Sequence, residues 1–181
     1  TLPGVMGAGG IQAMLKGQGV VPGKRIFLGG SHPLMLVVAA QLLDFGVLPA
    51  GVAFVQSRRR VLGALRQPMT ALRHAPILLQ GVRAYRKLAR AGVPLHFGKA
   101  VCRAEGSASL ESIALAPADR AGGAEEKVAC DTFGFCYGFT ASSEVPRQMG
   151  ANAIWSETGG GWIISHDETM QSSVEGLYVA G

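Results

Sequence analysis

The chain has 181 residues, of which 48% are hydrophobic and 16% are charged, and its formal net charge is +5. This is enough sequence for one full domain and part of a second, and the apolar content excludes an intrinsically disordered chain. The 26 glycines lie singly or in pairs beside apolar runs, which excludes a collagen-like repeat and favours tight turns between strands and helices. We expect a globular protein.

The longest apolar run, residues 33–43, is interrupted by Gln41 and is shorter than the roughly 20 residues needed to cross a bilayer, so we expect no membrane span. The three cysteines show no CxxC spacing, which favours buried thiols in a reducing compartment and predicts a cytoplasmic protein. The amino terminus has neither an initiator Met nor a signal-peptide pattern, and we interpret the chain as a fragment of a longer gene product.

The first part of the chain reads as a βαβ unit. Residues 11–18 predict a short helix, and a turn at 22–25 leads into a compact apolar strand at 26–28. Residues 33–45 are apolar nearly all round and predict a buried helix, which is followed by a second strand at 52–55. This order is the building block of a parallel sheet with right-handed crossovers.

The middle of the chain continues this pattern and then changes. We expect a helix at residues 61–72 with a break at Pro68, a basic amphipathic helix at 76–91 and a third strand at 93–97. Short alternating stretches follow at 100–104, 110–115 and 127–130, and they predict a β-meander. The fold class expected is therefore α/β: a Rossmann-like three-layer parallel sheet with a β-meander.

The last apolar strand of this domain is expected at residues 133–137. Beyond it, a short helix starts near Ser142, and three short strands are expected at 153–155, 162–164 and 177–179. So few core residues accompany these strands that they look like parts of a sheet whose partners are missing.

The turn between the first strand and the buried helix is the first candidate site. A glycine-rich turn in this context is where a dinucleotide pyrophosphate lies, against the helix amino terminus. With Gly30 as the first glycine of a GxGxxG fingerprint, His32 takes the second position and Met35 the third, while Ser31 and Pro33 complete the turn. Two readings stay open: a working nucleotide site, and a nucleotide-binding fold whose site is lost or altered.

The segment after the second strand is the second candidate. The acidic residue that normally accepts hydrogen bonds from the ribose is replaced there by Gln56-Ser57, followed by Arg58, Arg59 and Arg60. Arginines at this place suit a 2′-phosphate, so that NADP is favoured over NAD if a nucleotide binds. A solvated arginine cluster is an equal alternative.

Positive charge dominates a wider stretch, because no acidic residue lies between Asp44 and Glu105. This surface is either a solvated helix face or a contact for a phosphate, a partner protein or nucleic acid, but residues 83–90 lack the aromatic stacking platform of a nucleic-acid site. Ser165, His166 and Asp167 are neighbours in sequence and cannot form a relay, and the histidines and cysteines lack metal-ligand spacing. Catalytic residues stay unassigned, and neither a metal nor nucleic acid is expected.

Five segments carry a resemblance to a known family: "TLPGV" at residues 1–5, "PGKR" at 22–25 with the turn at 30–34, "AGVP" at 91–94, "CD" through "YGF" at 130–139, and "SVEGLYVAG" at 173–181. The chain resembles the flavoproteins of the pyridine nucleotide-disulfide oxidoreductase superfamily. Within it, the chain is most similar to the branch of opine oxidase A subunits and hydrogen cyanide synthase B subunits.

The resemblance implies a domain order. Residues 1–19 would be a linker or remnant of the FAD domain, residues 20–138 an inserted NAD(P)-binding-like domain, and residues 139–181 a partial FAD domain. Gly138 would allow close backbone approach at the nucleotide cleft, and Gly181 would lie at the flavin.

The resemblance also implies a function. The full-length parent would bind FAD and oxidise an amino acid, an opine or a related amine, with a second flavoprotein subunit and an iron–sulfur element as partners. NADP or NAD would be used only if the chain belongs instead to an NAD(P)H-dependent reductase of the same superfamily. A third reading is a non-catalytic module for the assembly of subunits.

Overall fold

The computed structural model describes residues 2–64, 75–120 and 122–180. The chain divides into two compact units, Thr1–Tyr137 and Gly138–Gly181, each with its own strands. Most of the helix predicted at residues 61–72, including the break expected at Pro68, lies outside the described residues, and its beginning is part of α3 (Arg58–Ala64).

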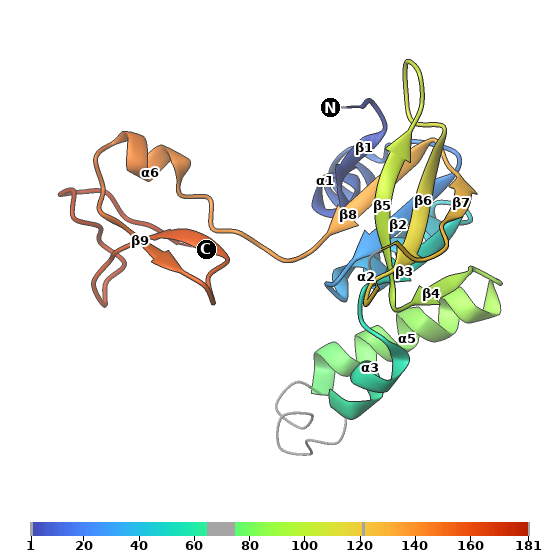
Figure 1. The fold of residues 1–181 in the computed structure, drawn as a ribbon. Coiled ribbons are helices and arrows are strands. Elements are labelled where there is room, and N and C mark those ends of the chain that lie inside the picture. The colour runs from blue at the N-terminus through green and yellow to red at the C-terminus, as the bar shows by residue number, and fades with distance from the viewer. Residues whose placement is uncertain (1, 65–74, 121, 181) are drawn as a thin grey trace. The chain divides into compact units, whose positions relative to one another are not determined.

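The first unit is built on a five-stranded sheet in which every neighbouring pair is parallel (Figure 1). The strand order across the sheet is β1-β8-β2-β3-β4. The strands are β1 (Val5–Gly7), β8 (Thr132–Cys136), β2 (Ile26–Gly30), β3 (Gly51–Phe54) and β4 (Leu95–Phe97). The parallel α/β sheet expected from the sequence is confirmed.

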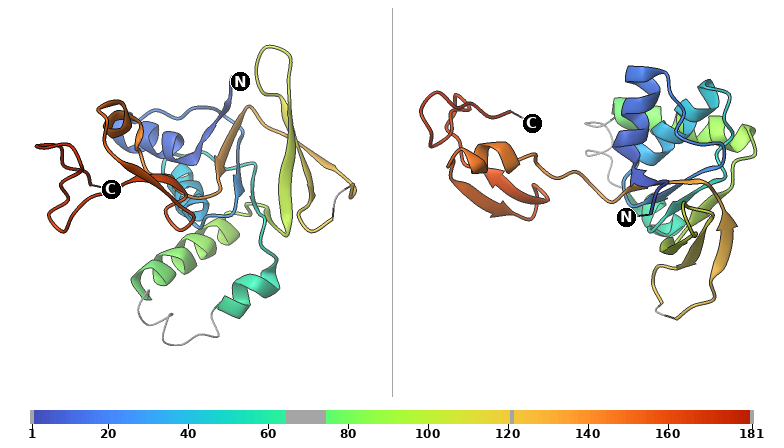
Figure 2. Two further views of the ribbon diagram at one scale, coloured as in Figure 1. Left: turned by 60° about the vertical axis from the view of Figure 1, so that its left-hand side comes forward. Right: turned by 90° about the horizontal axis from the view of Figure 1, so that it is seen from above.

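Helices cover one face of this sheet, as the right-hand view of Figure 2 shows. The helices in this layer are α1 (Ala8–Ala13) with its continuation η1 (Met14–Gln18), α2 (Leu34–Asp44) and α5 (Ala75–Arg90). Fully buried side chains from α2 and α5, such as Val38 and Leu88, join Leu28 and Val52 of the sheet in one core. Helix α2 is apolar nearly all round because it packs between the sheet and α5.

The opposite face is covered by a three-stranded antiparallel sheet, the expected β-meander. Its strands are β5 (Lys99–Glu105), β6 (Ser112–Pro117) and β7 (Glu126–Ala129), in that order. Phe27 and Phe133 of the parallel sheet pack with Ile113 and Leu115 of β6 in a second core. The first unit therefore has three layers: helices, parallel sheet and meander. The sequence predicted a three-layer fold with a meander, but not that the meander covers one face of the parallel sheet.

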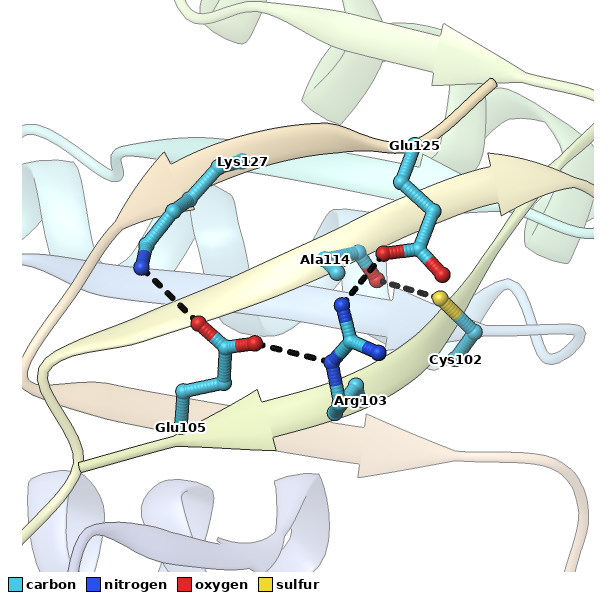
Figure 3. Close-up of polar contacts among 6 residues, drawn as sticks. All are labelled: Cys102, Arg103, Glu105, Ala114, Glu125 and Lys127. Atoms are coloured by element: carbon cyan, nitrogen blue, oxygen red, sulfur yellow. Dashed lines mark hydrogen bonds and ion pairs between the residues drawn. The ribbon is translucent and has the colours of Figure 1, made fainter. Parts of the chain in front are cut away.

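The outer surface of the meander is charged. Arg103 pairs with Glu105 and Glu125, and Lys127 pairs with Glu105, as Figure 3 shows. These side chains are 35–69% exposed, and exposed ion pairs contribute little to stability. The pairs mark the solvent side of this layer.

The second unit contains α6 (Glu144–Gln148) and a hairpin of β9 (Ala153–Ser156) and β10 (Gly161–Ile164). Trp155 and Trp162 face each other across this hairpin, with ring centroids 5.7 Å apart. The strand predicted at residues 177–179 is wrong: among the described residues, this segment forms only a single bridge, which joins Tyr178 to Gln171. The assignment of residues 139–181 to an FAD domain stays a prediction.

The amino-terminal residues belong to the first unit in this structure. Strand β1 pairs with β8, and Ala8 and Ile11 are fully buried against the helix-side core, so residues 5–18 are integrated into the fold of the first unit. The assignment of residues 1–19 to a linker or remnant of the FAD domain stays a prediction. The sequence analysis did not predict β1, because a three-residue edge strand is too short to show alternation.

One side chain joins the amino-terminal ends of β2 and β8. The carboxylate of Asp131 accepts hydrogen bonds from the backbone N–H groups of Lys24 at 3.0 Å and Arg25 at 3.0–3.1 Å. Gly23 lies so close that a Cβ there would be 2.3 Å from Asp131 Oδ1 and 2.1 Å from Thr132 Oγ1. The "PGKR" and "CD" segments thus meet at the start of the two central strands.

Replacing Asp131 with Ala should lower the free energy of unfolding of the first unit by about 1–2 kcal/mol, because two backbone donors lose a charged acceptor. Urea unfolding followed by far-UV circular dichroism measures this, since both tryptophans lie in the second unit and not in the first. Asp119→Ala, on an exposed loop, should change stability by less than about 0.5 kcal/mol. Equal effects of the two substitutions would contradict the anchoring role.

Candidate functional site

The loop after β2 lies at the point where the chain order across the sheet reverses. From β2 the chain continues to β3 and β4 on one side, whereas β8 and β1 lie on the other. In open α/β sheets the crevice at the carboxyl ends of such a strand pair is where ligands bind. The structure thus places Gly30, Ser31, His32 and Pro33 where the sequence predicted a nucleotide site.

Gly30 is required by the neighbouring strand. Its φ angle is +150°, and a Cβ atom there would lie 2.0 Å from the carbonyl oxygen of Cys136 in β8. No side chain fits at that distance, whether or not a ligand is bound. The first glycine of the fingerprint therefore serves the close approach of two strands.

Ser31 connects the loop to both adjacent strands. Its backbone N–H donates to the carbonyl oxygen of Cys136 at 2.9 Å, and its hydroxyl donates to the carbonyl oxygen of Tyr137, also at 2.9 Å. Its own carbonyl oxygen accepts a hydrogen bond of 2.8 Å from Nε2 of Gln56, just beyond β3.

The donors of the residues that follow Ser31 are also bound to protein acceptors, in β8 and in the loop itself. The N–H of His32 also donates to the Cys136 carbonyl, at 3.1 Å, and Nδ1 of His32 accepts from the N–H of Leu34 at 3.2 Å. Pro33 has no N–H to offer. At the third fingerprint position, Met35 is fully buried in the helix-side core. The two residues that stand in place of glycine, His32 and Met35, thus contribute to the structure of the loop and the core.

Arg58 and Arg59 begin helix α3 and are exposed. The guanidinium of Arg58 lies over the ring of Phe97, 5.1 Å from its centroid. In the segment that follows β3, the side chain that hydrogen-bonds to the loop is that of Gln56. The role of the two arginines toward a 2′-phosphate stays a prediction.

Two further glycines, Gly138 and Gly181, were predicted to contact a cofactor. Gly138 directly follows Tyr137, has a φ of +149° and has no heavy atom within 4 Å of a Cβ position, so this backbone has room for close approach of another group. Gly181 lies outside the described residues. The cofactor role of both stays a prediction.

The three cysteines form no disulfide among the described residues. All three cysteines are free, and Cys130 and Cys136 are buried. Burial in the meander-side core raises the pKa of the Cys130 thiol to about 11, so this group is protonated at neutral pH and is a poor nucleophile. Within residues 2–64, 75–120 and 122–180 there is also no cluster of three or more metal-ligating side chains.

No protein-family model matches the sequence. The sequence is nevertheless similar to named proteins. It is 32% identical to the opine oxidase A-subunit of Rhizobium meliloti over the whole chain, and 33% identical over 88% of the chain to the hydrogen cyanide synthase subunit HcnB of Pseudomonas aeruginosa. This chain is a homologue of these two proteins. It spans 39% and 34% of their respective lengths.

The fold comparison agrees with the sequence relatives. A FAD-dependent pyridine nucleotide-disulphide oxidoreductase from Desulfovibrio vulgaris superimposes with a TM-score of 0.62 over 99% of this opine oxidase homologue, at 17% identity, and 40% of that structure is covered. At this identity the likeness shows a shared fold. In the part of the chain that the structure describes, no helix is long and apolar enough to cross a membrane.

Sequence reasoning identified the loop but missed its partners. Cys136 was predicted only as a thiol within the strand at residues 133–137, and Gln56 as the replacement of an acidic residue. Neither was predicted to contact Ser31, yet the carbonyl oxygen of Cys136 and the side-chain amide of Gln56 both bind it. The sequence feature that could have indicated these contacts is Ser31, a polar residue between a glycine pair and a helix. Its polar groups need hydrogen-bond partners once the loop lies at the sheet edge. Which partners these are depends on the strand order.

Replacing Gly30 with Ala should destabilise the first unit by about 3 kcal/mol or more, because the new methyl group would overlap the backbone carbonyl of Cys136 in the neighbouring strand β8. Urea unfolding followed by circular dichroism measures the change. The matched control is Gly9→Ala in α1, which is exposed and has nothing within 4 Å of the added atom, so stability should stay equal or rise by up to about 1 kcal/mol. A Gly30→Ala protein as stable as the control would disprove the close approach.

Proposed function

We propose that this chain is the central dinucleotide-binding-like domain, with part of the FAD domain, of an FAD-dependent oxidoreductase that acts on an amino acid, an opine or a related amine. The observation that carries this proposal is the 32% identity to the opine oxidase A-subunit over the full length of the chain. The three-layer fold and its similarity to a pyridine nucleotide-disulphide oxidoreductase support the flavoprotein class.

In the whole protein, FAD would supply a two-electron acceptor for oxidation of the C–H bond beside the substrate nitrogen. Residues 176–180 of the second unit are the described residues that we expect to approach the flavin, by their resemblance to a flavin motif. Gly176 fits such an approach because no heavy atom lies within 4 Å of a Cβ position there.

We also propose that the partners include a second flavoprotein and an iron–sulfur element, and that the basic face of α5 contributes to assembly. Both relatives are named as subunits of larger enzymes, which supports a partner. The basic face consists of Arg83, Arg86, Lys87 and Arg90, which line one shallow groove on the helix. Lys87 pairs with Asp44, whereas the three arginines are exposed. An acidic partner surface is the complement of this face.

The cytoplasm is the compartment we propose. Three free thiols, two of them buried, support a reducing environment.

Anaerobic addition of an opine or amino acid to the purified full-length flavoprotein with its partner subunits should bleach the absorbance of the oxidised flavin, whereas NADPH should not. Stopped-flow absorbance with a panel of opines, amino acids and amines measures this. A matched set of carboxylic acids without the amine is the control and should leave the flavin oxidised. Bleaching by NADPH alone would favour the reductase alternative, and no bleaching by any compound would favour a non-catalytic module.

Reversing charge on the basic face should weaken assembly. We expect Arg86→Glu with Arg90→Glu to raise the dissociation constant between the flavoprotein and its partner protein by about tenfold or more at low ionic strength, with a smaller effect in high salt. Analytical ultracentrifugation of the reconstituted enzyme measures this. The control, Arg120→Glu on an exposed loop of the meander, makes the same type of change elsewhere. Unchanged affinity in the double variant would remove α5 from the interface.

A further inference from the structure

We propose that the carboxyl edge of the sheet over β8, β2 and β3 is closed to the pyrophosphate of a nicotinamide dinucleotide, and that Ser31 is the residue that closes it. The fold retains the crevice position of a nucleotide site, but its hydrogen-bond donors are directed to the protein itself. This inference is independent of the substrate proposed above.

The first argument is the use of the backbone donors. A pyrophosphate binds at a helix amino terminus through N–H groups that have no partner within the helix. Here the N–H groups of Ser31 and His32 both donate to the carbonyl oxygen of Cys136, that of Leu34 donates to the imidazole of His32, and that of Met35 donates to the carbonyl oxygen of His32. Pro33 contributes none. Each donor at the start of α2 would have to leave a protein acceptor before it could bind a phosphate.

The second argument is the position of the His32 side chain. In the fingerprint this position is glycine, so that the ligand can come close to the backbone. Nδ1 of His32 lies 3.2 Å from the backbone nitrogen of Leu34, so the imidazole stands over the amino terminus of α2. A phosphate oxygen approaching this N–H group would meet the ring instead.

The third argument is that the loop is attached on both sides. The Ser31 hydroxyl bonds to Tyr137 beyond β8, and the Ser31 carbonyl accepts from Gln56 beyond β3. The loop therefore cannot move away from β8 without losing contacts to the end of β3 as well. The hydrogen bond from Gln56 also occupies a place from which an acidic residue would reach the ribose of a dinucleotide.

Two-dimensional ¹⁵N NMR of the labelled chain, titrated with NADPH, NADH and inorganic pyrophosphate to millimolar concentration, tests this proposal. We expect no saturable shift of the amide signals of residues 31–36. Shifts confined to residues 83–90 would reflect charge attraction to the basic face of α5 and would agree with a closed edge. Saturable shifts of the residue 31–36 amides with NADPH or pyrophosphate would overturn it.

Hydrogen exchange gives a second, ligand-free measurement. The amides of Ser31 and His32 should exchange slowly, and Ser31→Ala, which removes the hydroxyl bond to Tyr137, should speed exchange of the His32 amide by on the order of tenfold. The control Ser109→Ala, at an exposed position of the meander loop, should leave the exchange of this amide unchanged. Rapid exchange of both loop amides in the unsubstituted chain would show that the edge is open.

Discussion

The placement of β8 between β1 and β2 is the constraint on which the rest of the first unit depends. This strand comes last in the unit, after the whole meander, yet it lies inside the parallel sheet, with a strand on either side. Its two ends are joined to β2 by different means: the Asp131 carboxylate binds the turn before β2, and the carbonyl oxygens of Cys136 and Tyr137 bind Ser31 after it. Because these contacts join residues more than 100 positions apart, the sheet is complete only when the end of the unit has folded.

The two covering layers follow from the alternation of side chains along the central strands. In β2, Ile26 and Leu28 point into the helix-side core, and Phe27 between them points into the meander-side core. In β3, Val52 and Ala53 divide in the same way. Parallel strands that are buried on both faces read as continuous apolar runs, so both layers are needed to keep these residues from water.

The loop after β2 has the position of a ligand site but makes contacts within the protein. Its position at the sheet edge is that of a dinucleotide site, but Gly30 accommodates a strand, Ser31 joins three chain segments and His32 covers the start of α2. A fold can keep its geometry while a former or alternative site takes on structural contacts, because the same backbone groups can bind either a ligand or the protein. The function proposed for this homologue of opine oxidase and hydrogen cyanide synthase subunits therefore does not rest on nucleotide binding at this loop.

The sequence by itself determined the fold class, the meander and the place of the candidate loop. Residues 26–28, 52–55 and 133–137 are apolar runs bounded by glycine or polar residues, and their local pattern alone predicts strands close to those observed. Only the tertiary structure decided that β1 exists, that Tyr178 forms a single bridge to Gln171 where a strand was expected, and that Gln56, Cys136 and Tyr137 meet at Ser31. The reason is physical: apolar periodicity is a property of neighbouring residues, whereas strand order and the hydrogen bonds of a sheet edge join residues that are distant in the chain.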